Sequence, residues 1–165
     1  MKILRQIHNL LTRHLRKLGV MQSLGFDQQV WGAKSVMDLM QFDSKFMLAE
    51  ADTDGTMYTV WLGSQDQISW GISVDTIGHA TTPAHDDGRG TDCQAWTYPP
   101  KVSYAQATQR LIQSGIHDVP TFCRLRQTVD YRQHNPFYDF VFANGKGGTA
   151  YVDAETGAVT YNPPV

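Results

Sequence analysis

The chain has 165 residues, of which 41% are apolar and 11% are aromatic, and this composition is typical of a soluble globular protein. Its net charge of -2 comes from 14 basic and 16 acidic residues. Five of the basic residues and none of the acidic ones lie before Asp27, so the rest of the chain has a net charge of -7. An acidic body argues against a nucleic-acid partner, because a duplex-binding surface needs clustered basic residues.

The first segment, residues 1–32, is predicted to hold an amphipathic helix followed by a connection. Apolar residues recur there at spacings of three and four: Ile3, Ile7, Leu10, Leu11, Leu15 and Leu18. This helix either packs with a solvated basic face or contacts a membrane surface or a partner. We see no secretory signal and no run of ~18 apolar residues, so we expect no transmembrane segment and a cytoplasmic location. An envelope location stays open if a leader was removed.

Residues 33–82 are predicted to form an α+β unit. A helix is expected over Ala33–Phe42, and a strand over Phe46–Asp52 is joined to Met57–Leu62 by an Asp-Gly turn. Apolar and polar residues then alternate strictly from Ile68 to Val74, which predicts a strand with one buried face.

A long irregular loop is expected over residues 83–101. Its stretch Pro83–Pro100 has three prolines, two glycines and three aspartates among eighteen residues. Loops of this length are often functional. The loop contains Trp96 and Tyr98, aromatic side chains that bind partners well when they are held on a surface. We predict partner binding by these two residues.

Residues 102–165 are predicted to form a second α+β unit. It begins with a helix over Val102–Gly115 that Ser103 caps, and several short strands follow. One face of the first strand carries Arg124, Arg126 and Arg132, which we add to the predicted partner-binding residues. The two units can be aligned as an internal repeat, or they share only the chemistry of hairpins.

The second unit also resembles a known family. The sequence SYAQATQRLIQSG, followed by strands and then by YVDAETGAV, resembles the PepSY domain family over Val102 to Tyr161, and more weakly over Ala33 to Thr82. In the YVDAETGAV turn, Asp153 is suited to accept backbone hydrogen bonds and Gly157 to take a left-handed conformation. The resemblance implies a non-catalytic module that binds or inhibits partners, with a peptidase among them.

Candidate catalytic and metal-binding residues lack a recognisable spacing. The residues His79, His85, Asp86, Asp87, Asp92 and Cys93 could supply metal ligands, but no motif organises them, and a solvated loop is the simpler interpretation. Cys123 with a histidine is a weak candidate for a nucleophile, and a buried thiol is favoured. Whether Cys93 and Cys123 pair stays open. We therefore predict no catalytic residues, no metal and no cofactor.

The sequence as a whole predicts an α+β protein, with an N-terminal amphipathic helix followed by two helix-plus-antiparallel-meander units, the second of them PepSY-like. The predicted function is a protein-binding or inhibitory module that is not an enzyme. One alternative is a small cytoplasmic antagonist, either a toxin-immunity or a phage-encoded protein. A less favoured alternative is a metal-dependent hydrolase that uses the His85 and Asp87 loop.

Overall fold

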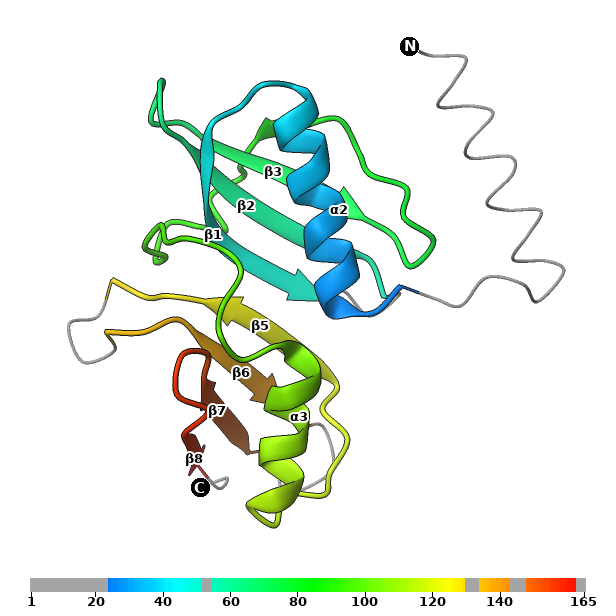
Figure 1. Cartoon of the computed structure of the whole chain (residues 1–165), viewed down its shortest axis with the longest axis vertical. Helices are drawn as coiled ribbons and strands as arrows, with labels where there is room; N and C mark the ends of the chain where they lie inside the picture. Colours follow the sequence, from blue (N-terminus) through cyan, green and yellow to red (C-terminus); the bar gives the residue numbers. More distant parts are fainter. Residues whose placement is uncertain (1–23, 52–54, 130–133, 143–147, 163–165) are drawn as a thin grey trace, which may run out of the picture.

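The computed structural model describes residues 24–51, 55–129, 134–142 and 148–162. In these ranges the chain forms two helices and eight strands (Figure 1). Their bounds are α2 Phe26–Leu39, β1 Ser44–Ala51, β2 Met57–Gly63, β3 Ser69–Val74, β4 Ala84–His85, α3 Tyr104–Gln113, β5 Phe122–Arg126, β6 Phe137–Val141, β7 Thr149–Asp153 and β8 Val159–Asn162. The predicted N-terminal helix lies outside the described residues.

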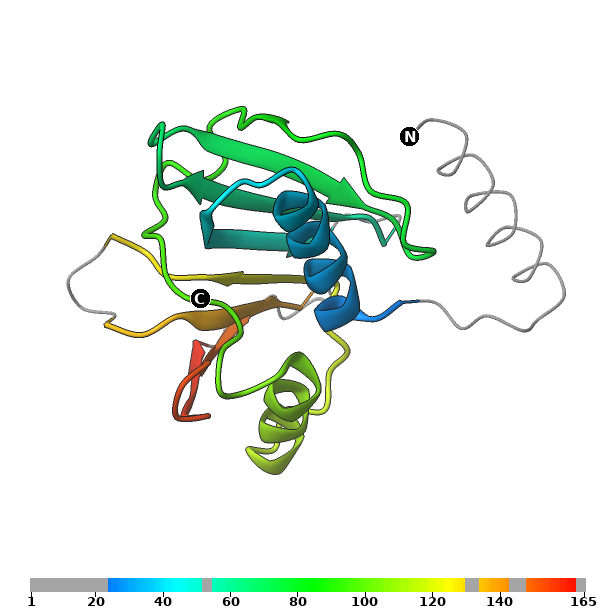
Figure 2. The same cartoon turned by 45° about the horizontal axis from the view of Figure 1, so that its top comes forward.

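The eight strands form one continuous antiparallel sheet in the order β4-β3-β2-β1-β5-β6-β7-β8. Strands β1 and β5 are neighbours at its centre, where Leu48 faces Arg126 and Glu50 faces Arg124 (Figures 1 and 2). The prediction of two helix-plus-meander units is therefore wrong. The β1–β5 hydrogen bonds join segments more than 70 residues apart, and such a pairing has no local signature in the sequence.

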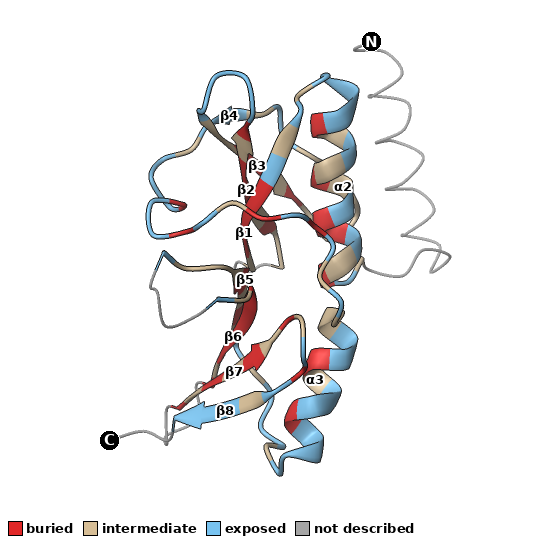
Figure 3. Cartoon of the chain, turned by 60° about the vertical axis from the view of Figure 1, so that its left-hand side comes forward, coloured by how far each residue is buried: buried red, intermediate tan, exposed pale blue. Residues whose placement is uncertain are grey.

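Both helices cover the same face of the sheet (Figure 3). Helix α2 buries a stripe made of Phe26, Val30, Ala33 and Met37, and α3 buries Ala107 and Leu111. These spacings of three and four residues place each set on one side of its helix. The main core lies between this helical layer and the sheet, and it includes Trp61, Tyr138 and Phe140.

The segment 90–97 reinforces the centre of the sheet. The backbone N–H of Trp96 donates to the carbonyl oxygen of Phe46 at 2.8 Å, and that of Gln94 donates to Gln127 at 2.6 Å. Cys93 packs with Val60 in a second, smaller cluster on the face away from the helices. The loop therefore covers the part of the helix-free face that β1 and β2 form.

Several local predictions are confirmed. The hairpin of β1 and β2 and the strand β3 lie where the sequence placed them. Ser103 caps α3, since its hydroxyl accepts from the N–H of Gln106 while the Gln106 side chain accepts from the N–H of Ser103. Helix α2, in contrast, begins at Phe26 and not at Ala33, so the predicted connection up to residue 32 is partly helical.

Candidate functional site: the arginine face

The helix-free side of β5, β6 and β7 carries the arginines that the sequence singled out. Along β5, Cys123 and Leu125 point into the core beneath the helices, so Arg124 and Arg126 point to the opposite face. In the sheet register, Arg124 faces Asp139 of β6, and Asp139 faces Tyr151 of β7.

We call this surface the arginine face. It comprises Phe122, Arg124, Arg126, Phe137, Asp139 and Tyr151.

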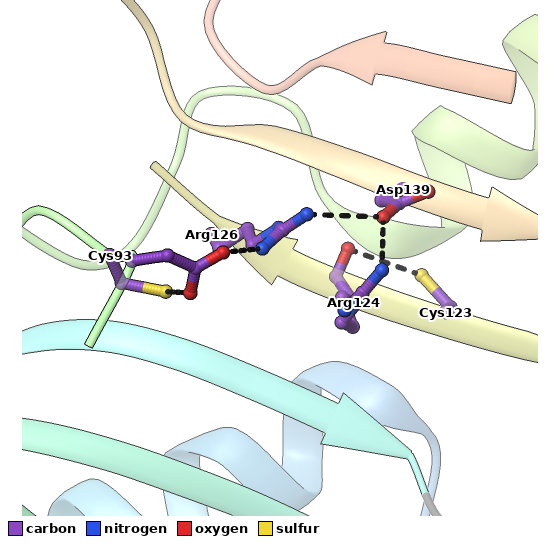
Figure 4. A network of polar contacts seen from close by, with 6 residues as sticks. Cys93, Cys123, Arg124, Arg126 and Asp139 are labelled. Carbon is purple, nitrogen blue, oxygen red and sulfur yellow. Dashed lines mark hydrogen bonds and ion pairs between the residues drawn. The ribbon is translucent and has the colours of Figure 1, made fainter. Parts of the chain in front are cut away.

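A buried carboxylate organises the two arginines (Figure 4). Asp139 is only 2% exposed. Its Oδ2 accepts a hydrogen bond from Nη2 of Arg124 at 2.8 Å and lies 3.6 Å from Nη2 of Arg126. Nη1 of Arg126 also donates to Oδ2 of Asp92, which belongs to the long loop. One charged network thus ties β5, β6 and the loop together.

Burial makes this network costly to break. A carboxylate removed from water is stable only when paired charges and hydrogen bonds replace its hydration. Asp139 meets that need with one oxygen, while its Oδ1 has no partner among the described residues. Asp139 thus anchors Arg124 by a hydrogen bond and Arg126 by an ion pair, while Nε of each arginine is buried without a partner among the described residues.

The network leaves part of its charge accessible beside aromatic rings. The Arg124 side chain is 32% exposed, and its guanidinium lies 5.4 Å from the ring centre of Phe122. The guanidinium of Arg126 lies 5.8 Å from the ring centre of Phe137, which meets Tyr151 edge to face at 5.6 Å. Arginine and aromatic side chains held in this way are the residue types that dominate protein contacts.

A hollow of about 380 Å³ adjoins the arginine face. It is lined by His134, Asn135, Phe137, Tyr151, Asp153, Ala158 and Thr160. Asp153 is already engaged at its rim, because its carboxylate accepts the backbone N–H groups of Glu155 and Thr156 at 2.8 Å and the side-chain amide of Asn135 at 3.0 Å. The hollow offers room for a side chain next to Tyr151.

The loop aromatics that the sequence predicted for partner binding lie in the core. Trp96 is 9% exposed and Tyr98 is 7% exposed. Both rings pack on Phe46, with ring centres 5.0 and 5.2 Å away. The expectation that they are displayed on a surface is therefore corrected, because the chain is drawn into the core by the pairing of Trp96 with Phe46. Arg132, the remaining predicted residue, lies outside the described residues.

The candidate metal ligands do not converge. Asp86 accepts from the Tyr58 hydroxyl, Asp87 contacts Arg89, and His85 packs against Trp70. Within the described ranges, no group of three or more histidine, cysteine or acidic residues is placed to hold a metal ion.

The two cysteines are buried, free and in separate clusters, Cys93 on the helix-free face and Cys123 in the main core. Burial, together with the neighbouring charge of Asp92, raises the pKa of Cys93 to about 12. Burial also raises the pKa of Cys123 well above its usual value. Both thiols are therefore protonated at neutral pH, and the thiolate is the reactive form of cysteine.

Sequence reasoning missed Asp139, Phe137 and Tyr151. A charged residue in the middle of an otherwise apolar strand, as in Phe137–Val141, was the available signal for Asp139. Its partner Arg124 could not be found, because residues 127–136 connect β5 to β6 and no short turn fixes the register between the two strands.

Comparisons with known proteins add the fold alone. No protein-family model matches the chain, and no curated protein is similar to it in sequence. Among solved structures, the chain is similar to a protein of Clostridium difficile 630 described as a "putative lipoprotein", with a TM-score of 0.52 and 11% identity. The match covers 79% of this chain and 89% of that one. The resemblance to PepSY domains stays a prediction.

None of the helices in the described ranges is long and apolar enough to cross a membrane.

Proposed function

We propose that this chain is a non-catalytic protein-binding or inhibitory module that contacts its partner through the arginine face. The observation that carries the proposal is the network around Asp139, which fixes two guanidinium groups beside aromatic rings and leaves Arg124 partly exposed. Side chains held in position before binding lose less conformational entropy when a partner arrives.

The chemistry of the cysteines argues against a cysteine nucleophile. A thiol with a pKa of about 12, as in Cys93, is a poor nucleophile at neutral pH. The metal-dependent hydrolase has less support, since Asp86, Asp87 and Asp92 are each occupied by a different partner. Elemental analysis of the purified protein tests it, and a stoichiometric transition metal would revive this alternative.

The class of partner follows from the sequence resemblance. PepSY-like domains imply a protein partner, with a peptidase among the candidates. The second candidate function, a small antagonist such as an immunity protein, is favoured by the net charge of -7 after residue 26, because an acidic body suits a basic target.

The compartment belongs to the same proposal. The sequence predicts the cytoplasm, whereas the solved structure with a similar fold is described as a lipoprotein, a setting at the cell envelope. Fractionation of native cells followed by immunodetection decides between the two locations.

Affinity capture with matched variants tests the proposed surface. Arg124→Ala and Tyr151→Ala alter the arginine face, whereas Lys34→Ala alters a half-buried residue of α2 on the other side of the sheet. We expect a stoichiometric partner to be captured by the wild type and by Lys34→Ala, and to be lost with both arginine-face variants. Equal capture by all four proteins would refute the proposed surface, provided that circular dichroism shows each variant to be folded.

A further inference from the structure

The sheet ends in an exposed edge at β8. This strand pairs with β7 on one side and is the last strand of the sheet on the other. Thr160, Tyr161 and Asn162 are exposed, with Tyr161 at 43%. The opposite edge is β4, which has only two residues. An exposed edge strand presents unpaired backbone groups that can pair with another strand.

The alternation of hydrogen-bonded pairs across β6, β7 and β8 determines which backbone N–H and C=O groups of β8 point away from the sheet. The N–H of Phe142 donates to Gly148, so the even-numbered residues of β7 bond to β6 and its odd-numbered residues bond to β8. The N–H of Asp153 donates to Ala158, which agrees with this alternation. In β8, Thr160 therefore bonds to β7, and the N–H and C=O groups of Val159 and Tyr161 point away from the sheet.

Within β8 itself, no residue is of a type that usually blocks strand addition, although the strand is only four residues long. The sequence from Val159 to Asn162 is VTYN, with no charged residue, no proline and no glycine. Natural edge strands commonly carry lysine, proline or a bulge that prevents pairing between molecules.

We propose that β8 pairs antiparallel with β8 of a second copy of this chain, with Thr160 on the two-fold axis. In this register Val159 faces Tyr161 of the partner subunit, and Tyr161 faces Val159 of the partner subunit. Each such pair exchanges two backbone hydrogen bonds, so the contact makes four. If the register shifted so that Tyr161 lay on the axis, Val159 would lie opposite Pro163 of the partner subunit. Proline has no backbone N–H to donate, so this register would lose hydrogen bonds.

The side chains suit the same register. Thr160 would lie directly opposite Thr160 of the partner subunit in a non-hydrogen-bonded pair, where side chains approach closely. Threonine pairs and pairs of an aromatic with a β-branched residue are both favourable across antiparallel strands. A second copy is the occupant because VTYN is complementary to itself in this register, and because a net charge of -2 gives little repulsion between copies. The contact is short, so the association is weak and depends on concentration.

Charge substitutions at Thr160 test the pairing. The side chain is exposed on the helix-free face, so Thr160→Asp and Thr160→Lys each preserve the fold while placing like charges opposite one another across the axis. Sedimentation equilibrium from about 10 µM to about 1 mM measures the association of each protein and of their equimolar mixture. Thr108→Asp, at a half-buried position of α3 away from the edge, is the control.

We expect the wild type and Thr108→Asp to form dimers as concentration rises, both Thr160 variants alone to stay monomeric, and the mixture of the two to associate again. Circular dichroism and a melting curve verify that each variant is folded. A wild-type protein that is monomeric throughout the range overturns the proposal. Dimers of Thr160→Asp would place any association elsewhere on the molecule and overturn the proposal as well. A mixture that fails to associate would contradict the predicted contact between the two Thr160 side chains and overturn the proposed register.

Discussion

Replacing Asp139 with asparagine probes the network that holds the arginine face. The amide keeps the size and shape of the carboxylate but removes its charge, so Arg124 and Arg126 lose the group that compensates them. Because Asp139 is 2% exposed, no solvent is available to restore that compensation at the carboxylate itself.

The expected loss of stability follows from the burial of the pair. Removing one partner of a fully buried ion pair costs about 3–5 kcal/mol. The value is reduced here because Arg124 is one-third exposed and Arg126 keeps its contact with Asp92. We therefore expect Asp139→Asn to lower the free energy of unfolding by about 2–3 kcal/mol.

Urea denaturation followed by tryptophan fluorescence measures this loss. Asp38→Asn is the control, since Asp38 makes a 2.8 Å ion pair with Lys34 on the exposed side of α2, where loss of the pair costs less than about 1 kcal/mol. A double-mutant cycle with Arg124→Met isolates the coupling between Arg124 and Asp139. If Asp139→Asn costs no more than Asp38→Asn, the buried network does not stabilise the sheet and our reasoning fails.

Three further predictions concern the scaffold. Ser103→Ala removes the cap of α3 and should lower the free energy of unfolding by about 1 kcal/mol in urea denaturation, whereas no loss would contradict the capping box. Gly157→Ala should lower the free energy of unfolding by about 1–2 kcal/mol in the same assay, because Gly157 has a φ of +77° and an added Cβ would lie 3.2 Å from Nε of Arg110. An unchanged midpoint of urea denaturation would argue against the left-handed turn. Native protein at pH 8 should resist iodoacetamide at both Cys93 and Cys123, because the raised pKa keeps each thiol protonated at that pH. Mass spectrometry should show two modifications only after the protein is unfolded. A rapid modification of the folded protein would contradict the burial of the thiols.

Local structure could be predicted from the sequence because its signals are local. The alternation from Ile68 to Val74 indicated β3 correctly. The turn at the end of the chain also behaves as expected, since the Asp153 carboxylate accepts two backbone N–H groups and Gly157 adopts a positive φ. Side-chain chemistry within a few residues determines such features.

The start of α2 was missed although its signal was present. Gly25 and Gly32 lie in the predicted connection, but Phe26, Val30, Ala33 and Met37 already have the spacing of a buried helical stripe. Packing of that stripe against the sheet outweighs the cost of about 1 kcal/mol that a glycine imposes within a helix.

The arrangement of the sheet and the position of the loop aromatics could not be found in this way. The β1–β5 pairing depends on contacts between distant segments, and no alternation pattern identifies a strand's neighbour. Trp96 and Tyr98 lie among prolines and aspartates, which is typical of a surface loop, yet the backbone bond from Trp96 to Phe46 brings both rings into the core.

Site-specific photo-crosslinking in native cells tests the central claim, that the arginine face is the contact surface, most directly. A benzoylphenylalanine placed at Tyr151 lies on this face, and one placed at the exposed Trp31 of α2 lies on the helical side of the molecule. The account predicts a discrete crosslinked partner from position 151 and none from position 31. Crosslinks from position 31 alone, or from neither position, would contradict it.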